Sequence, residues 1–166
     1  MRTLAATAVH SRPLLSALAL VGWVALSFTA AAMGAFFLPG EWYAGLRKPA
    51  WNPPNWIFGP VWTVLYATMG ITAWLVWKRG GFAGQRIALS LFLRQLLLNA
   101  LWSPLFFGLR NPGLAFVDIV LPWLAVLVTV IAFWKAHSFS GALLVPYLTW
   151  VTFASALNFA IWRLNR

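Results

Sequence analysis

The sequence predicts an all-α integral membrane protein built as a five-transmembrane-helix bundle. Of its 166 residues, 62% are hydrophobic and 8% are charged, whereas soluble domains carry roughly 25% charged residues. The apolar residues gather in five runs, each close to the roughly 20 residues with which a helix crosses a bilayer. These runs cover residues 14–38, 58–77, 87–108, 114–134 and 141–162. We therefore expect residues 1–166 to form a single transmembrane domain.

The first run follows a basic segment that contains Arg2 and Arg12, as the apolar core of a secretory signal does. Such cores have about 7 to 15 residues, and here the run is longer and four more spans follow it. We therefore expect the first run to remain as a helix. Four small residues in this run suit close helix contact and a homodimer. They are Ala30, Ala31, Gly34 and Ala35.

The net charge of +10 comes from 12 Lys and Arg residues set against only two carboxylates. The cations form neither a run nor a helical stripe, but flank the ends of the apolar runs. This pattern is typical of contacts with lipid headgroups, so we expect the bilayer as a partner and no nucleic acid. The two ends of the bundle carry nearly equal numbers of cations. The positive-inside rule therefore leaves the orientation and the host membrane open.

Residues 39–57 form the only long connection, and connections of this length in a compact bundle are more often functional than incidental. Three prolines and four aromatic residues mark it: Pro49, Pro53, Pro54, Trp42, Tyr43, Trp51 and Trp56. The prolines fix their own φ angles and bias the preceding residues toward extended conformations, which makes the loop stiff. Such an arm could form a lid over the bundle, with Arg47 and Lys48 as cations at its rim. Anchoring at the membrane interface is a second, compatible role.

Polar and aromatic residues lie on single faces of three predicted helices, with smaller or apolar residues beside them. The face of the third helix consists of Gln95, Asn99, Trp102 and Phe106, that of the fifth of Pro146, Trp150, Ala154 and Asn158, and that of the second of Trp62, Tyr66, Met69 and Ala73. Two interpretations remain open. The amides either join helices through hydrogen bonds or line a ligand cavity with the indoles, whose flat faces suit a large planar ligand.

Ordered motifs along most of the chain resemble the translocator protein family, whose members are also called tryptophan-rich sensory proteins. WYAGLRKPAWNPP spans residues 42–54, and GPVWTVLYATMG follows at residues 59–70. Three later motifs are QLLLNALW at residues 95–102, FFG at residues 106–108 and VPYLTW at residues 145–150. The pattern ends with Ala154, Leu157 and Asn158, and the resemblance covers about residues 38–165.

The resemblance implies a homodimeric five-helix membrane protein that binds porphyrins such as protoporphyrin IX. In some members it also implies binding of cholesterol or of synthetic benzodiazepine-type and isoquinoline carboxamide ligands. The implied pocket lies among the helices under the first loop, and eight residues match its motifs: Trp42, Tyr43, Trp51, Trp62, Gln95, Asn99, Trp150 and Ala154. The sterol motif departs from the family pattern, because Phe159 stands where an aromatic hydroxyl is expected.

The leading hypothesis is a membrane binding protein for porphyrins that acts in their transport, sensing or disposal. One alternative is an enzyme that breaks down protoporphyrin IX in light, since the tryptophans matching Trp62 and Trp150 are implicated in that reaction in some members. A second alternative is a sterol or lipid binder. Hydrolytic catalysis is poorly supported, because Glu41 and Asp118 are the only carboxylates and no nucleophile and base converge. We expect no cofactor and no metal site.

Overall fold

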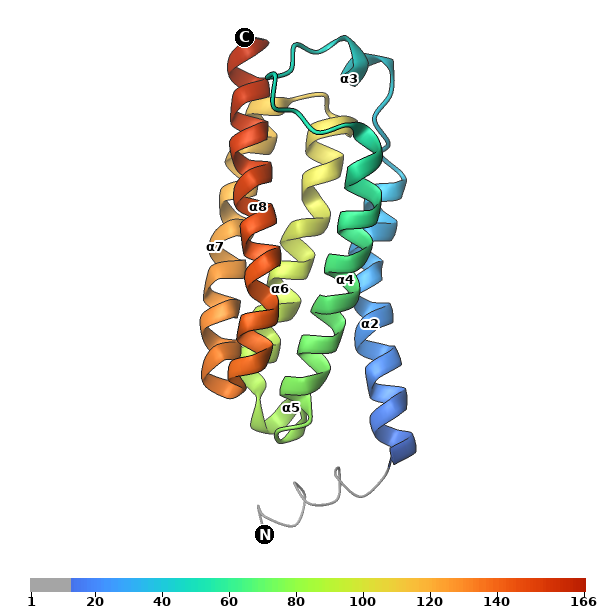
Figure 1. Ribbon diagram of the computed structural model, residues 1–166, viewed down its shortest axis with the longest axis vertical. Helices are drawn as coiled ribbons and strands as arrows, with labels where there is room; N and C mark the ends of the chain where they lie inside the picture. Colours follow the sequence, from blue (N-terminus) through green and yellow to red (C-terminus); the bar gives the residue numbers. More distant parts are fainter. Residues whose placement is uncertain (1–12) are drawn as a thin grey trace.

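The computed structural model describes residues 13–166, and their five long helices run along a common axis (Figure 1). The long helices are α2 (Pro13–Ala35), α4 (Asn55–Trp77), α6 (Arg86–Ser103), α7 (Pro112–Ala136) and α8 (Ser138–Leu164). A π-helical turn, η1 (Pro104–Gly108), continues α6. Five segments, with α6 and η1 taken together, are long and apolar enough to cross a membrane. The predicted fold class is therefore confirmed.

With α6 and η1 taken together, the observed ends of the long helices lie within three residues of the predicted ones. Arg2 and Arg12, the cations of the basic segment before the first run, lie outside the described residues. Two short helices were not predicted: α3 (Glu41–Gly45) within the first loop and α5 (Gly81–Gly84) between α4 and α6.

Local sequence explains where α7 begins and how the chain turns after α4. α7 starts at Pro112, where a missing backbone N–H costs nothing because first-turn donors have no helical partner. The side chain of Asn111 caps α7 by accepting a hydrogen bond of 2.9 Å from the backbone N–H of Leu114. After α4, Gly80 and Gly81 take positive φ angles of 156° and 65°. Glycine adopts such angles without strain, so the chain turns sharply there.

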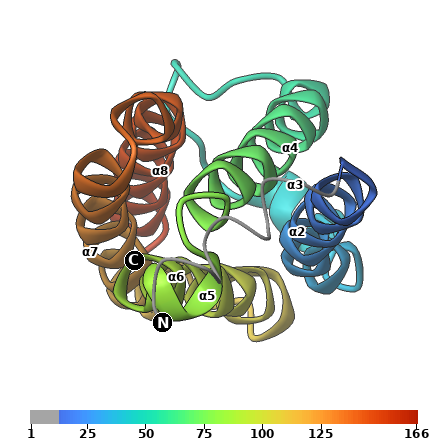
Figure 2. The same cartoon turned by 90° about the horizontal axis from the view of Figure 1, so that it is seen from below.

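Seen along its axis, the bundle is a ring of helices (Figure 2). α7 packs against both α6 and α8, α2 packs against α4 and α6, and contact between α4 and α8 closes the ring. The main core cluster includes Met69, Phe92 and Phe133, which are fully buried. A second cluster, centred on Tyr43 and Phe106, lies at the end of the bundle that the first loop covers. The loop is therefore packed as part of the protein interior.

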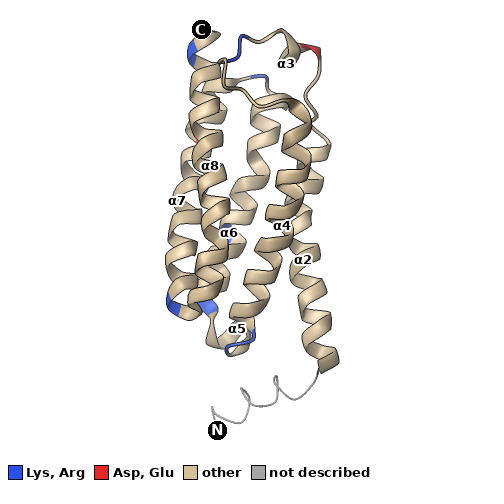
Figure 3. Cartoon of the chain, in the orientation of Figure 1, with Lys and Arg blue, Asp and Glu red and all other residues tan. Residues whose placement is uncertain are grey.

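The cations of the described chain gather at the two ends of the bundle (Figure 3). Lys78, Arg79, Arg86 and Lys135 mark one end, and Arg47, Lys48, Arg110, Arg163 and Arg166 mark the end with the loop. Arg94 is the exception, since it lies within α6, where its side chain is exposed on the outer surface. A long cationic side chain in this position reaches toward the headgroups by snorkelling. The charge pattern is thus the one that a lipid bilayer favours.

α2 and α4 pack tightly against each other at Gly70. A Cβ atom built on this residue would lie 2.5 Å from the Cα atom of Val24 and 2.8 Å from its backbone nitrogen. No real side chain tolerates such contacts with backbone atoms, which cannot move aside as a flexible side chain does. Glycine at residue 70 therefore sets the separation of the two helices.

Gly70→Ala is expected to lower the apparent melting temperature of the protein in detergent, followed by circular dichroism. Overpacking of this kind costs about 1 to 3 kcal/mol, which corresponds to a fall of roughly 2 to 10 °C. Gly22→Ala is the matched control in α2, because a Cβ atom there meets nothing within 4 Å. An equal loss in both variants would contradict the assignment of the effect to the Gly70 contact.

Candidate functional site

A cavity of about 390 Å³ lies inside the loop-covered end of the bundle. Its walls come from all five long helices, from η1 and from the first loop. Sites for drug-sized ligands span about 300 to 1,000 Å³, so the cavity is large enough to hold one. The residues that line it include seven with polar side chains but none with a charge. A ligand would therefore be held by apolar contacts and neutral hydrogen bonds.

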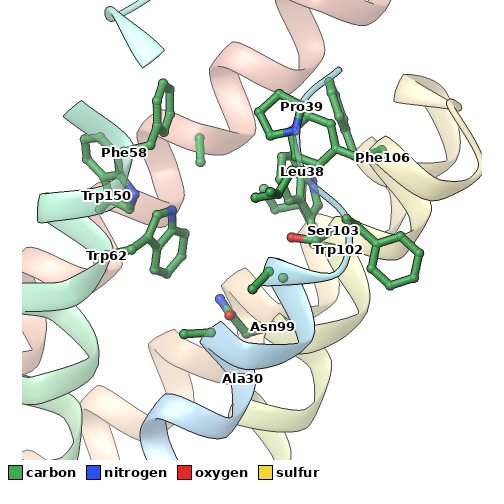
Figure 4. Close-up of a pocket in the computed structure, with 18 of the residues that line it drawn as sticks. Ala30, Leu38, Pro39, Phe58, Trp62, Asn99, Trp102, Ser103, Phe106 and Trp150 are labelled. Atoms are coloured by element: carbon green, nitrogen blue, oxygen red, sulfur yellow. The ribbon is translucent and has the colours of Figure 1, made fainter. Parts of the chain in front are cut away.

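Aromatic side chains form two facing walls of the cavity (Figure 4). Phe58 and Trp62 of α4 stand with Trp150 of α8 on one side, and Trp102 and Phe106 stand on the other. The ring centroids of Phe58 and Trp150 lie 5.8 Å apart, and those of Trp102 and Phe106 lie 4.8 Å apart in a stacked arrangement. Each wall thus has its own aromatic contacts and is held in place without a ligand.

A chain of hydrogen bonds forms the floor and joins α4, α6 and α8. The Tyr66 hydroxyl donates to Asn99 Oδ1 at 2.8 Å, and Asn99 Nδ2 donates to the Tyr147 hydroxyl at 3.1 Å. The Tyr147 hydroxyl in turn donates to Gln95 Oε1 at 2.9 Å. Asn99 and Tyr66 also line the cavity. The polar floor is therefore fixed by its own contacts, with Asn99 at its surface.

The π-helical turn η1 supplies the contact between the loop and the bundle. Its residue Phe106 is 1% exposed and meets the rings of Trp42 and Tyr43 edge-on, at 5.8 Å and 6.1 Å. Tyr43 also lines the cavity. Burial raises the pKa of the Tyr43 hydroxyl, so this group stays protonated at neutral pH and can donate a hydrogen bond. The loop thereby brings a donor into the roof of the cavity.

The indole N–H of Trp150 is a second hydrogen-bond donor at the cavity, and it has no partner in the described structure. Its indole Nε1 atom is buried and makes no hydrogen bond, while its ring lines the cavity. A buried donor without a partner costs roughly 1 to 3 kcal/mol. A bound ligand with an acceptor near this atom would recover that energy. Asp118 Oδ2 is also buried without a partner, but Asp118 does not line the cavity.

Five of the eight residues expected to form the pocket line the cavity: Tyr43, Trp62, Asn99, Trp150 and Ala154. The other three lie just outside its walls. Gln95 is 1% exposed and accepts from Tyr147, so it supports the floor. Trp42 packs on the outer side of Phe106. Trp51 is 50% exposed and meets Phe153 edge-on at 5.8 Å. These three residues act on the shape of the site, and in this conformation they do not face the cavity.

The two cations expected at the ligand rim do not line the cavity either. The Lys48 ammonium donates to three backbone carbonyls, those of Tyr43 at 2.6 Å, Leu46 at 3.2 Å and Ala44 at 3.3 Å. It also lies 4.4 Å from the centroid of the Tyr43 ring. All three hydrogens of the Lys48 ammonium are thus used on carbonyls of α3 and of Leu46 directly after it, and the role of Lys48 as a cation at the ligand rim stays a prediction. Arg47 is exposed on the outside of the loop.

Sequence reasoning missed the wall that α2 contributes. The small residues Ala30, Ala31, Gly34 and Ala35 line the cavity, although we expected them to support a dimer. Ser103 of α6 stands against this wall, since its Oγ atom would lie 3.3 Å from a Cβ atom on Gly34. The spacing of these residues does signal a close approach, but not whether the neighbour is another subunit or a ligand.

His137 lies in the connection between α7 and α8, at the end of the bundle away from the loop (Figure 1). Its Nδ1 atom lies 2.7 Å from Ser140 Oγ. Burial and then the charge of Arg79 lower the pKa of His137, so its imidazole is neutral at pH 7. This histidine takes no part in the cavity.

Comparison with known proteins confirms the resemblance of the motifs. The model of the TspO/MBR family matches residues 14–163. The chain is 45% identical over 154 residues to Translocator protein from Homo sapiens, covering 86% of this chain and 91% of that protein. It is 48% identical over 135 residues to Tryptophan-rich protein TspO from Archaeoglobus fulgidus, with coverage of 80% and 87%. It is 44% identical over 135 residues to Tryptophan-rich sensory protein from Cereibacter sphaeroides, with coverage of 81% and 84%. The chain is thus an integral multi-pass membrane protein that belongs to the TspO/MBR family.

Proposed function

We propose that this protein binds a porphyrin of the protoporphyrin IX type in the cavity under the first loop, and acts in its transport, sensing or disposal. The observation that carries the proposal is the uncharged cavity between two aromatic walls. The faces of Trp62 and Trp102 suit the flat ring of a tetrapyrrole. The unpartnered Nε1 atom of Trp150 and the hydroxyl of Tyr43 offer hydrogen bonds to polar atoms of the ligand.

The carboxylates of such a ligand would stay outside this uncharged wall, because burying an unpaired charge is costly. Asn55 and Thr63 line the cavity in the part of α4 that follows the loop. The Asn55 amide offers a hydrogen-bond donor, whereas the Thr63 hydroxyl already donates to the Gly59 carbonyl at 2.9 Å and can only accept. Arg47 is the exposed cation of the loop and would attract the carboxylates from outside. The planar body and the acidic edge of the ligand would thus occupy different environments.

A light-dependent breakdown of protoporphyrin IX is the second candidate. Trp62 and Trp150 supply indoles to one wall, where both would lie against a bound ring (Figure 4). Breakdown of the ring is an oxidation in which molecular oxygen, activated by the excited porphyrin, would be the oxidant. Indoles beside the ring would be oxidised first and would then take electrons from the porphyrin. A sterol or another lipid is a third candidate for the same cavity, and its binding is tested by competition. A homodimer is also proposed, from membership of the family.

Titration of the purified protein with protoporphyrin IX is expected to quench tryptophan fluorescence in a saturable way. Ala154→Leu should weaken this binding about tenfold or more, or roughly 1.4 kcal/mol, because the larger side chain enters the cavity from its α8 wall. Ala156→Leu is the matched control on the exposed face of α8 and should bind as the wild type does. Absence of saturable quenching would contradict the porphyrin proposal. Displacement of bound porphyrin by cholesterol would indicate that a sterol occupies the same cavity.

Illumination of the complex separates the binding protein from the enzyme. Loss of the porphyrin Soret band in light, at a rate that depends on the protein, is expected only if the protein breaks its ligand down. In that case Trp62→Phe and Trp150→Phe should slow the loss at least tenfold while changing affinity less, since Phe keeps the apolar wall but lacks the indole. Equal effects on breakdown and on affinity would make both residues simple walls of the cavity.

A further inference from the structure

The first loop is attached to the bundle at three places. Trp42 and Tyr43 pack on Phe106 at one side of the cavity, and Trp51 packs on Phe153 of α8 at the other. Between these aromatic contacts the loop crosses the carboxyl end of α8 (Figure 1). The residue that attaches the loop there is Asn165, directly after the last residue of α8.

The Asn165 amide pairs with the backbone of a single loop residue, Arg47. Its Oδ1 atom accepts from the Arg47 N–H at 2.9 Å, and its Nδ2 atom donates to the Arg47 C=O at 2.9 Å. The pair therefore reproduces, with a side chain, the two-bond contact between facing residues of an antiparallel sheet. Nδ2 donates in addition to the backbone oxygen of Ile161 at 2.7 Å, which fixes the orientation of the amide on α8.

This contact requires the amide group of asparagine. An amide carries an acceptor and a donor side by side, whereas a carboxylate carries only acceptors and would face the Arg47 carbonyl with a second oxygen. Leu46, the residue before Arg47, is partly buried against the cluster of Tyr43 and Phe106. The side chains of Arg47 and Ala50 are exposed and bury no apolar surface on α8. The contact of this part of the loop with the end of α8 thus depends on the two hydrogen bonds.

The loop is also organised internally before it reaches α8. The Lys48 ammonium holds three carbonyls of the segment that includes α3, next to the residue that Asn165 binds. Residues 43–48 are therefore tied into one unit by Lys48, and that unit is tied to α8 through Asn165. Tyr43, in the roof of the cavity, belongs to the same unit.

We infer that Asn165 is a positioning residue that keeps the loop closed over the cavity and thereby sets how long a ligand remains inside. The part of this inference that concerns ligand residence depends on the proposed function, and the part that concerns loop closure does not. Two hydrogen bonds that are exposed to water at one edge hold the loop only moderately, since each is worth little net free energy. The loop therefore opens often enough for ligand exchange, and Asn165 sets that frequency.

Trypsin cleavage between Arg47 and Lys48 tests loop closure without any ligand. A protease needs an extended, locally released segment, so cleavage of the folded protein reports the open population. Asn165→Ala and Asn165→Asp should each raise the rate of cleavage at this bond roughly tenfold, identified by mass spectrometry of the fragments. Arg166→Gln is the matched control at the next residue, because Arg166 stacks on Trp162 and makes no hydrogen bond with the loop. Its cleavage rate should equal that of the wild type.

Dissociation of protoporphyrin IX, followed by fluorescence after dilution, tests ligand residence. Both Asn165 variants should raise its dissociation rate constant by roughly the same factor as cleavage, with an unchanged melting temperature. Cleavage at the wild-type rate in both variants would overturn the inference. Faster cleavage with an unchanged dissociation rate constant would overturn the claim that Asn165 sets how long the ligand remains in the cavity. If the wild type binds no porphyrin, the proposed function fails, and the cleavage rates alone decide whether Asn165 closes the loop.

Discussion

The structure depends on the rule that polar groups inside a bilayer must find their partners within the protein. Helices satisfy this rule for the backbone, and the chain from Tyr66 through Asn99 and Tyr147 to Gln95 satisfies it for side chains. These four residues come from three helices, so their hydrogen bonds also fix the mutual positions of α4, α6 and α8. Above this level the same helices separate and leave a cavity. The polar chain therefore marks the boundary between the packed half of the bundle and the half that is open to a ligand.

The first loop completes the cavity because its backbone has a defined structure that packs on the bundle. Tyr43 is 6% exposed, and the nearby Lys48 ammonium donates to the carbonyls of Tyr43, Ala44 and Leu46. These hydrogen bonds stabilise the carboxyl end of α3, a short helix that would not form alone. The cation of the loop that remains outside is Arg47, whose backbone rather than whose side chain makes the contact with α8. Adjacent cations in one motif thus have different roles.

Much of the fold could be predicted from the sequence because length and apolar content decide which segments cross a bilayer. Part of the cavity wall could also be predicted, since Trp62, Asn99 and Trp150 each share a helical face with other polar or aromatic residues. Helical spacing places a residue on a face, but does not say which neighbour that face meets. For that reason Gln95 was expected at the ligand, although it lies one turn below the cavity floor and supports Tyr147. The role of Asn165 depends on where a loop folds back over 118 residues of chain, and no local pattern carries that information. The bonds of Lys48 are local, to carbonyls two to five residues before it, but they form only because α3 brings those carbonyls together.

The α2 wall exposes the shape of the cavity to the influence of the surrounding lipid. Only Ser27 and Ala30 of this helix are buried within the described bundle, and its outer face contacts the lipid of the membrane. α2 is fixed against α4 at Gly70, and its tilt also responds to the thickness of the lipid around it. The width of the cavity is therefore expected to depend on the protein and its lipid together. Affinities measured in a micelle and in a bilayer are expected to differ for this reason.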